Sequence, residues 1–350
     1  MRQLVSVRLI QGIFLLFVAG FFLVTCQAQQ VTLRARTNLV LVPTLVETKS
    51  GEPVFNLTAK DFLVTDNGVE QKTHLDTDTD KSAISMVVLV QTGRSAVREF
   101  HNYQGLPTMV EALAGDTQHR IAVVTFDSRP RMLLDFSGSP DAVERAIYSI
   151  RPGDGEAAIL DSVWYAADML ADEPAQNQRV IVLLSETRDH GSRTPIQQVV
   201  QKIGRTDVIV YSLTFSPSHA DLMESLKAPV GSGSADLLAP LLMTIQAFRK
   251  NTAAALPRMT GGQYLRFNQG KQLDRDLGML ANQVHNRYIL SFQPSNLKPG
   301  LHLLNVSLKL PLEGIRVLAR TGYWAVSQPG ISQEETRPPD ASIAPESPRD

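Results

Sequence analysis

The stretch Ser85-Met-Val-Val-Leu-Val90, followed directly by Gln91-Thr-Gly-Arg-Ser95, decides the fold of this chain. Its first part is apolar at almost every position, which is typical of a strand buried on both faces of a parallel sheet. Its second part is a short polar loop, and a helical pattern begins after it. A buried strand that leads through such a loop into a helix is the repeating unit of an α/β fold.

Three further buried strands are predicted along the chain, and helical stretches lie between them. The strands are expected at Ile121–Phe126, Arg179–Leu184 and Val208–Thr214, and the helices at Pro140–Ile150, Ala157–Ala171 and Pro195–Gly204. This alternation predicts an α/β fold with a doubly wound, mostly parallel, Rossmann-like sheet. Ligands of such sheets bind at the carboxyl ends of the strands, where Gln91, Asp127 and Ser185 are expected.

The two ends of the chain are predicted to be β-rich. The segment 31–80 contains Phe62–Asp66 followed by Asn67-Gly68, which is a strong hairpin signal. The segment 269–326 contains a helix, Lys271–His285, and then three apolar strand patterns in succession, which indicate antiparallel structure. These strands are expected at Arg287–Phe292, Leu301–Leu310 and Ile315–Val326. We expect the N- and C-terminal segments to pack into one β-sandwich, and we group the helix with it.

The alternating region spans residues 83–268 and is longer than its strands and helices require. The excess falls at 217–259, where Gly231-Ser-Gly-Ser234 is typical of a loop and a helix is expected from about Leu237 to Ala255. We interpret this stretch as an insertion, and a lid over the site is the alternative. The tail 327–350 is rich in Pro, Ser and Glu, and it is predicted to be disordered.

The N-terminal residues 1–28 have the pattern of a secretory signal. Two arginines precede an apolar run, Leu9–Val24, which is shorter than the about 20 residues that cross a bilayer. The protein is therefore predicted to be exported, and to be periplasmic, cell-surface or secreted. Cys26 is the only cysteine and follows an imperfect lipobox, so a lipid on Cys26 is the one membrane link that the sequence suggests.

The loop Gln91-Thr-Gly-Arg-Ser95 resembles the first loop of a von Willebrand factor type A domain, where Asp-x-Ser-x-Ser offers oxygens to a divalent cation. Other stretches are similar to the opening and the end of the bacterial, acidobacterial-type VWFA-related proteins. They are Gly51-Glu-Pro-Val54, Leu57-Thr58, Asp61–Val69, Thr260-Gly-Gly262, Tyr288–Pro294 and Gly322-Tyr323. The resemblance covers about residues 31–326 and implies a type A fold.

The resemblance also implies where a metal-ion-dependent adhesion site would lie. Its positions correspond to Gln91, Gly93, Ser95, Ala157 and Glu186. Only Ser95 is unchanged, and Arg94 adds a positive charge that opposes a cation. The sequence thus predicts a degenerate site with no metal and no cofactor. If Mg²⁺ or Ca²⁺ is bound, Ser95, Gln91 and Glu186 would hold it; a salt bridge between Arg94 and Glu186 in place of the ion is the simpler interpretation.

These features favour a non-enzymatic scaffold that binds a protein partner through the loops Gln91–Ser95, Gly153–Ala158 and Glu186–Ser192. Family members with an intact site can share their cation with a partner's carboxylate; here side chains would make the contact directly. The expected contact residues are Gln91, Arg94, Ser95, Glu156 and Glu186. The formal net charge of -1 argues against nucleic acid as a partner.

Two alternatives are left open by the sequence. The first is metal-dependent adhesion through a site rebuilt from loop carboxylates. The second is a hydrolase that uses Ser185 and His190 with Asp189, although the sequence contains no His-Glu-x-x-His, Gly-x-Ser-x-Gly or phosphate-binding loop motif.

Overall fold

The computed structural model of the protein describes residues 39–76, 83–115, 117–215, 238–267, 270–296 and 298–326. The predicted signal segment with Cys26, residues 217–237 of the predicted insertion, and the tail 327–350 lie outside these described residues. No helix in the described ranges is long and apolar enough to cross a membrane.

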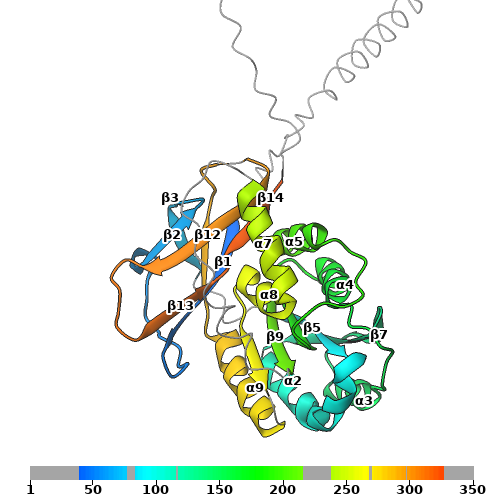
Figure 1. Cartoon of the computed structure of the whole chain (residues 1–350). Coiled ribbons are helices and arrows are strands. Elements are labelled where there is room, and N and C mark those ends of the chain that lie inside the picture. Colours follow the sequence, from blue (N-terminus) through cyan, green and yellow to red (C-terminus); the bar gives the residue numbers. More distant parts are fainter. Residues whose placement is uncertain are drawn as a thin grey trace, which may run out of the picture. The chain divides into compact units, whose positions relative to one another are not determined.

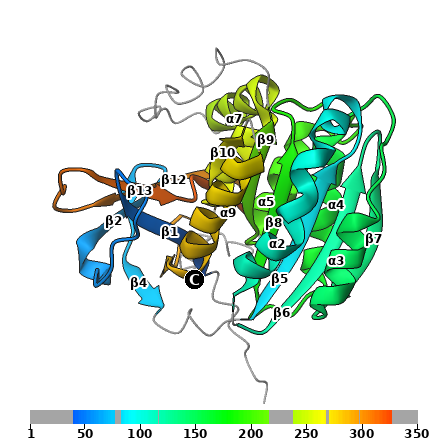
Figure 2. The same ribbon diagram turned by 90° about the horizontal axis from the view of Figure 1, so that it is seen from below.

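A six-stranded sheet organises the larger part of the structure (Figure 1), and its strands have the order β10-β9-β8-β5-β6-β7 (Figure 2). Its strands are β5 (Ile84–Gln91), β6 (His119–Phe126), β7 (Pro130–Ser137), β8 (Gln178–Ser185), β9 (Ile209–Phe215) and β10 (Tyr264–Phe267). All neighbouring pairs are parallel except β6 and β7. The predicted doubly wound, mostly parallel fold is therefore confirmed, and β7 adds an antiparallel edge strand that the sequence analysis missed.

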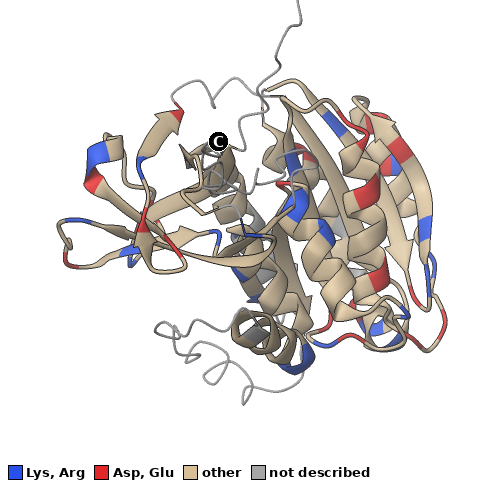
Figure 3. Cartoon of the chain, turned by 90° about the horizontal axis from the view of Figure 1, so that it is seen from above, with Lys and Arg blue, Asp and Glu red and all other residues tan. Residues whose placement is uncertain are grey.

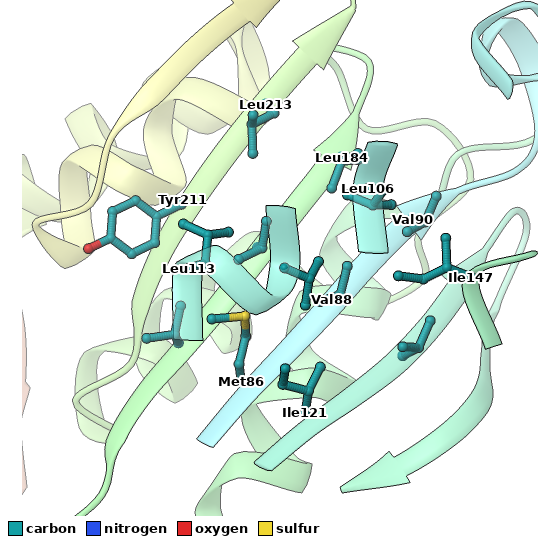
Figure 4. Packing of buried hydrophobic residues seen from close by; sticks show 14 of the residues in the cluster. Met86, Val88, Val90, Leu106, Leu113, Ile121, Ile147, Leu184, Tyr211 and Leu213 are labelled. Carbon is teal, nitrogen blue, oxygen red and sulfur yellow. The ribbon is translucent and has the colours of Figure 1, made fainter. Parts of the chain in front are cut away.

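Helices cover both faces of this sheet. One face carries η3 (Arg94–Gly105), α2 (Leu106–Ala114), α3 (Pro140–Tyr148) and α9 (Gly270–His285), and the other carries α4 (Ile159–Ala171), α5 (Ile196–Arg205), α7 (Leu238–Lys250) and α8 (Thr252–Thr260). Along β5, Met86 and Val88 lie in the core with α2 (Figure 4), whereas Val87 packs with α4. Side chains of a strand alternate between faces, so a strand covered on both sides must be apolar throughout.

The helices between β9 and β10 belong to the core. Phe248 of α7 and Leu256 of α8 are buried in the cluster that also contains Val210. Two parallel strands need a crossover connection, and α8 lies against both β9 and β10. The prediction of a simple insertion is therefore wrong for residues 238–259. The single helix expected there is also interrupted, because the Asn251 side chain caps α8 by accepting from Ala254 N–H at 2.9 Å.

Helix α9 packs mainly on the central sheet, and its Gln283 also donates to Glu47 of β1 at 2.9 Å. Leu280 and Val284 are buried in the same cluster as Met86, and α9 lies against α2 and β10 (Figure 2). Grouping this helix with the C-terminal strands is thus corrected. Its buried side chains face α2 and the sheet, and after α9 the chain returns to the sandwich at β11.

Two four-stranded antiparallel sheets form the sandwich, each from both ends of the chain. One has the order β13 (Ile315–Ala319), β1 (Val40–Thr48), β11 (Tyr288–Phe292), β4 (Thr73–Asp76), and the other β14 (Gly322–Ala325), β12 (Gly300–Leu308), β2 (Phe62–Asp66), β3 (Val69–Glu70). Val42, Phe62 and Phe292 lie in their shared core. The single strand expected over Ile315–Val326 is two strands, because the chain passes from one sheet to the other after Ala319.

Arg320 lies at this crossing and ties the sandwich to the central domain. Its side chain is buried, and its guanidinium contacts Asp207 at 2.6 Å and the Gly204 carbonyl oxygen at 2.7 Å, both near the end of α5. Trp324 of β14 packs on the same side, directly over Gly204. A buried charge needs such a full set of partners, so Arg320 orients one structural part against the other.

A buried polar cluster lies inside the sandwich. His302 Nδ1 is 2.9 Å from Asp66 Oδ1, its Nε2 is 2.7 Å from the Lys298 carbonyl oxygen, and the Tyr323 hydroxyl donates to Asp66 Oδ2 at 2.8 Å. Because both ring nitrogens face acceptors, the imidazolium form satisfies both. Burial alone would lower the pKa of His302, but the bonds to Asp66 and Lys298 outweigh it and raise that pKa above its usual 6.5.

We expect the stability of the sandwich to fall as the pH rises above about 6.5. The pKa of His302 is higher in the folded than in the unfolded state, so its bound proton stabilises the folded protein. This contribution is complete below the unfolded-state pKa and is lost as the pH rises through the folded-state pKa. Melting temperatures across this range should decline less steeply for His302→Gln. His74→Gln, which changes an exposed histidine on β4, is the control and should keep the wild-type slope; equal slopes for all three proteins would contradict the assignment.

Candidate functional site

Three loops converge at the carboxyl ends of β5, β6 and β8. They are the predicted segments Gln91–Ser95, Gly153–Ala158 and Glu186–Ser192. Backbone bonds hold them together: Gly153 N–H donates to Thr92 O at 2.9 Å, Arg94 N–H to Asp154 O at 3.1 Å, and Ala157 exchanges two bonds with His190. Because β5 lies between β6 and β8, the loops meet where the strand order reverses, which is where such sheets hold their sites.

Gln91 is an internal tie between two of these loops. It is completely buried, its Oε1 accepts from Glu186 N–H at 2.8 Å, and its Nε2 donates to the Gly93 carbonyl oxygen at 3.1 Å. The amide thereby holds the end of β5 against the end of β8. This burial corrects the expectation that Gln91 contacts a partner, since no surface of its side chain is available.

The carboxylate of Glu186 lies at the centre of the convergence. Ser95 Oγ donates to its Oε2 at 2.6 Å, and Arg94 Nε is 2.9 Å from its Oε1, with His190 Nε2 3.6 Å from the same oxygen. The Glu186 side chain is 13% exposed and that of Arg94 is 40% exposed. The salt bridge expected between Arg94 and Glu186 is therefore present, with the glutamate as the buried partner and the arginine at the surface.

Arg94 is held in an unusual backbone conformation. Its φ of 51° is in the left-handed region, which costs a residue with a side chain about 1 kcal/mol or more. Its backbone N–H bond to Asp154 and its ion pair with Glu186 offset this cost. The chain thus turns sharply at Arg94 and sets the guanidinium over the carboxylate.

Two acidic residues of the Gly153–Ala158 loop lie at the exposed rim. Glu156 is exposed and lies beside Gly191 of the third loop. Asp154 Oδ1 accepts from Ser128 N–H at 3.1 Å and from Glu156 N–H at 3.0 Å. Bonds from Ser128 and from the Glu156 backbone lower the pKa of Asp154, so this carboxylate stays charged.

Asp127, directly after β6, supports the Gly153–Ala158 loop. Its side chain is buried, its Oδ2 is 2.5 Å from Arg131 Nη1, and its carbonyl oxygen accepts from Ala158 N–H at 2.7 Å. The sequence placed Asp127 at this edge, but the pairing with Arg131 was not predicted. The sequence feature that could have indicated this pair is Arg131, four residues after Asp127 and in the edge strand β7.

The side chains at the convergence do not fit a divalent cation. Gln91 uses both ends of its amide inside the protein. Glu186 Oε2 accepts from Ser95, and its Oε1 lies 2.9 Å from the Arg94 guanidinium, whose positive charge opposes a cation at that oxygen. Ala157 has no donor atom. Within the described ranges, no group of three or more His, Cys, Asp or Glu side chains is arranged to hold a metal ion.

The close approach of the loops also leaves no room for a serine side chain at position 93. A Cβ on Gly93 would fall 2.6 Å from the Asp154 carbonyl oxygen and still closer to that of Glu156. These are backbone atoms that are held by the bonds described above, so they cannot move aside without opening the site.

We expect Gly93→Ser to destabilise the protein by about 1–3 kcal/mol, the usual cost of overpacking. Gly155→Ser is the matched control in the neighbouring loop, because nothing lies within 4 Å of a Cβ there. Chemical denaturation should separate the two variants. Equal stability of Gly93→Ser and the wild type would show that the loops do not approach as described.

Ser185, His190 and Asp189 do not form a nucleophile and base. Ser185 is buried, and its Oγ donates to the Glu186 carbonyl oxygen at 2.8 Å. Asp189 Oδ1 accepts from Leu160 N–H at 3.0 Å, and burial raises its pKa. His190 is paired with Glu186 instead. The arrangement needed for the hydrolase hypothesis is therefore not present among these residues.

Residues 80–188 match the family model described as von Willebrand factor type A domain. Those residues include β5, β6, β8 and all three converging loops up to Arg188. No curated protein matches the chain.

Several solved structures are similar to the chain at low sequence identity. A von Willebrand factor type A protein from Catenulispora acidiphila has a TM-score of 0.44 and 11% identity, and the match covers 84% of this chain and 75% of that one. An aerotolerance-related membrane protein from Bacteroides fragilis has a TM-score of 0.40 and 12% identity, covering 57% and 98%. Proximal thread matrix protein 1 from the mussel byssus has a TM-score of 0.41 and 13% identity, and the match, over 57% of this chain, spans about half (48%) of that protein.

Proposed function

We propose that this chain, which carries a von Willebrand factor type A domain at residues 80–188, is an exported, non-enzymatic protein that binds a protein partner without a metal ion. The observation that carries this proposal is the ion pair of Arg94 with Glu186 at the convergence of the three loops. Through this pair, Glu186 holds the Arg94 guanidinium in place at the rim of the site. Export rests on the pattern of residues 1–28, and the intact mass of the mature protein tests it.

Arg94 is suited to anchor an acidic side chain of a partner. Its Nε faces Glu186, and among the described residues no hydrogen bond uses its two terminal nitrogens. A guanidinium can hold a carboxylate through two parallel bonds, which gives both strength and direction. Glu186, fixed by Ser95 and by the buried Gln91, orients the guanidinium before a partner arrives.

The rest of the rim would set the specificity of binding. Glu156 lies beside Gly191, and His190 faces the same Glu186 oxygen as Arg94, so both offer groups that can accept or donate a bond. Figure 3 shows basic and acidic residues interspersed over the view from above, so the molecule does not present one uniformly basic face there. A partner surface with one acidic anchor and mixed polar surroundings is the best match.

We expect Arg94→Ala to weaken partner binding by about tenfold or more, the usual effect of removing a charged anchor from an interface. Crosslinking in the native host with mass spectrometry first identifies the partner, and titration of the purified pair then measures affinity. Arg98→Ala, an exposed arginine one turn further along η3, is the control. Unchanged affinity for Arg94→Ala would remove this surface as the binding site.

We further expect Mg²⁺, Ca²⁺ or Mn²⁺ at millimolar concentration to leave the melting temperature unchanged. An ion that binds the folded state at about 100 times its dissociation constant would stabilise it by about 2.7 kcal/mol, which a thermal scan detects readily. A shift that grows with ion concentration would instead favour the alternative, metal-dependent adhesion through a rebuilt site.

A further inference from the structure

An apolar hollow opens at the surface between η3 and the end of α3. It is lined by Phe100 and Tyr103 of η3, by Ile147 and Tyr148 of α3, and by Ile150. Tyr148 is 56% exposed and Phe100 is only partly buried, so solvent reaches the hollow. Its volume is about 120 Å³. Small-molecule sites are larger, about 300 Å³ or more, so the hollow is suited to a single large side chain.

The geometry of η3 extends this apolar surface beyond the hollow. A 3₁₀ helix has three residues per turn, so side chains three positions apart lie one above the other. Val97, Phe100 and Tyr103 have this spacing, and the ring centres of Phe100 and Tyr103 are 5.7 Å apart. Val97 is 43% exposed. An apolar strip thus leads from the hollow toward the first residue of η3, which is Arg94.

The hollow and the candidate site also share one segment of chain. Asp154, four residues after Ile150, accepts from Arg94 N–H through its carbonyl oxygen at 3.1 Å. Arg151 lies in this segment, and its Nη1 donates to the carbonyl oxygens of Tyr148 at 3.1 Å and Ile150 at 2.9 Å. The segment therefore forms one wall of the hollow and also holds the backbone of Arg94.

The combination of a charged anchor and a neighbouring apolar hollow decides which occupant fits. A purely apolar segment would leave the guanidinium of Arg94 without a counter-charge, and a lone acidic group would leave the hollow open to water. Interfaces gain most of their affinity where a few large or charged side chains enter such positions together. A partner segment with both kinds of side chain satisfies both features.

We propose that the partner presents one short extended segment, in which an acidic side chain pairs with Arg94 and a large apolar side chain fills the hollow. This inference rests on the proposed function, because it takes Arg94 as the anchor. Phe100 lies about 12 Å from Arg94 along the axis of η3, at about 2 Å per residue. An extended chain spans that length in about four residues, and side chains four positions apart point to the same side of it.

A random peptide library displayed on phage tests the proposal without knowledge of the partner. It is selected on the full mature chain, and the enriched peptides are then synthesised and titrated against the wild type, Arg94→Ala and Tyr148→Ala. We expect the enriched sequences to combine Asp or Glu with a large apolar residue about four positions away. Both variants should bind them about tenfold or more weakly. Leu242→Ala, which removes a side chain of similar exposure (57%) from α7 on the other face of the sheet, is the control.

The outcomes separate this inference from the proposed function. Peptides that require Arg94 but bind Tyr148→Ala as tightly as the wild type would overturn the hollow and retain the anchor. Peptides that bind Arg94→Ala unchanged would contradict both. A selection that enriches no such sequence would also overturn the inference, because a short segment would then be insufficient.

The partner found by crosslinking provides a second measurement. Val97→Ser removes apolar surface from the middle of the strip and should weaken partner binding about threefold or more, whereas Val69→Ser, at an exposed valine of β3 in the sandwich, should not. If Arg94→Ala weakens partner binding but Val97→Ser and Tyr148→Ala do not, the partner uses the anchor without the strip and the inference is wrong.

Discussion

The contact between Arg94 and Glu186 is the interaction on which the candidate site depends. A carboxylate that is 13% exposed needs a positive charge beside it, and here that charge is attached to the chain instead of arriving from solution. Once the guanidinium is in place, a cation would face like charge and would find few free oxygens. One side chain therefore both stabilises the loop convergence and changes the kind of ligand that the convergence is suited to bind.

The rest of the site keeps this pair in position. Gln91 joins the ends of β5 and β8 through its buried amide, Asp127 supports the Gly153–Ala158 loop, and Gly93 lets that loop approach closely. Each of these residues is fixed by bonds inside the protein, so their part is to position Arg94 and Glu186. Only the outer rim, with Arg94 and Glu156, is left to meet a partner.

The two ends of the central strands have different surroundings. The carboxyl ends are open and carry the polar loops, whereas the amino ends of β5 and β9 face the sandwich across a cavity. Arg320 closes one side of that junction with a full set of partners, and Arg287 lines the cavity with part of its guanidinium unpaired. The junction is thus held by the buried Arg320, which has partners in both structural parts.

Much of the fold followed from the sequence, because local patterns carry it. The apolar run of β5 and the alternation of strands and helices predicted the doubly wound sheet, and the salt bridge between Arg94 and Glu186 was also expected. Tertiary structure decided the rest. That Gln91 is buried, that α8 is a crossover and not an insertion, and that α9 joins the central domain depend on which surfaces meet, and neighbouring residues in the sequence do not encode this. The cavity between the sandwich and the amino ends of β5 and β9 likewise exists only because strands far apart in the sequence come together.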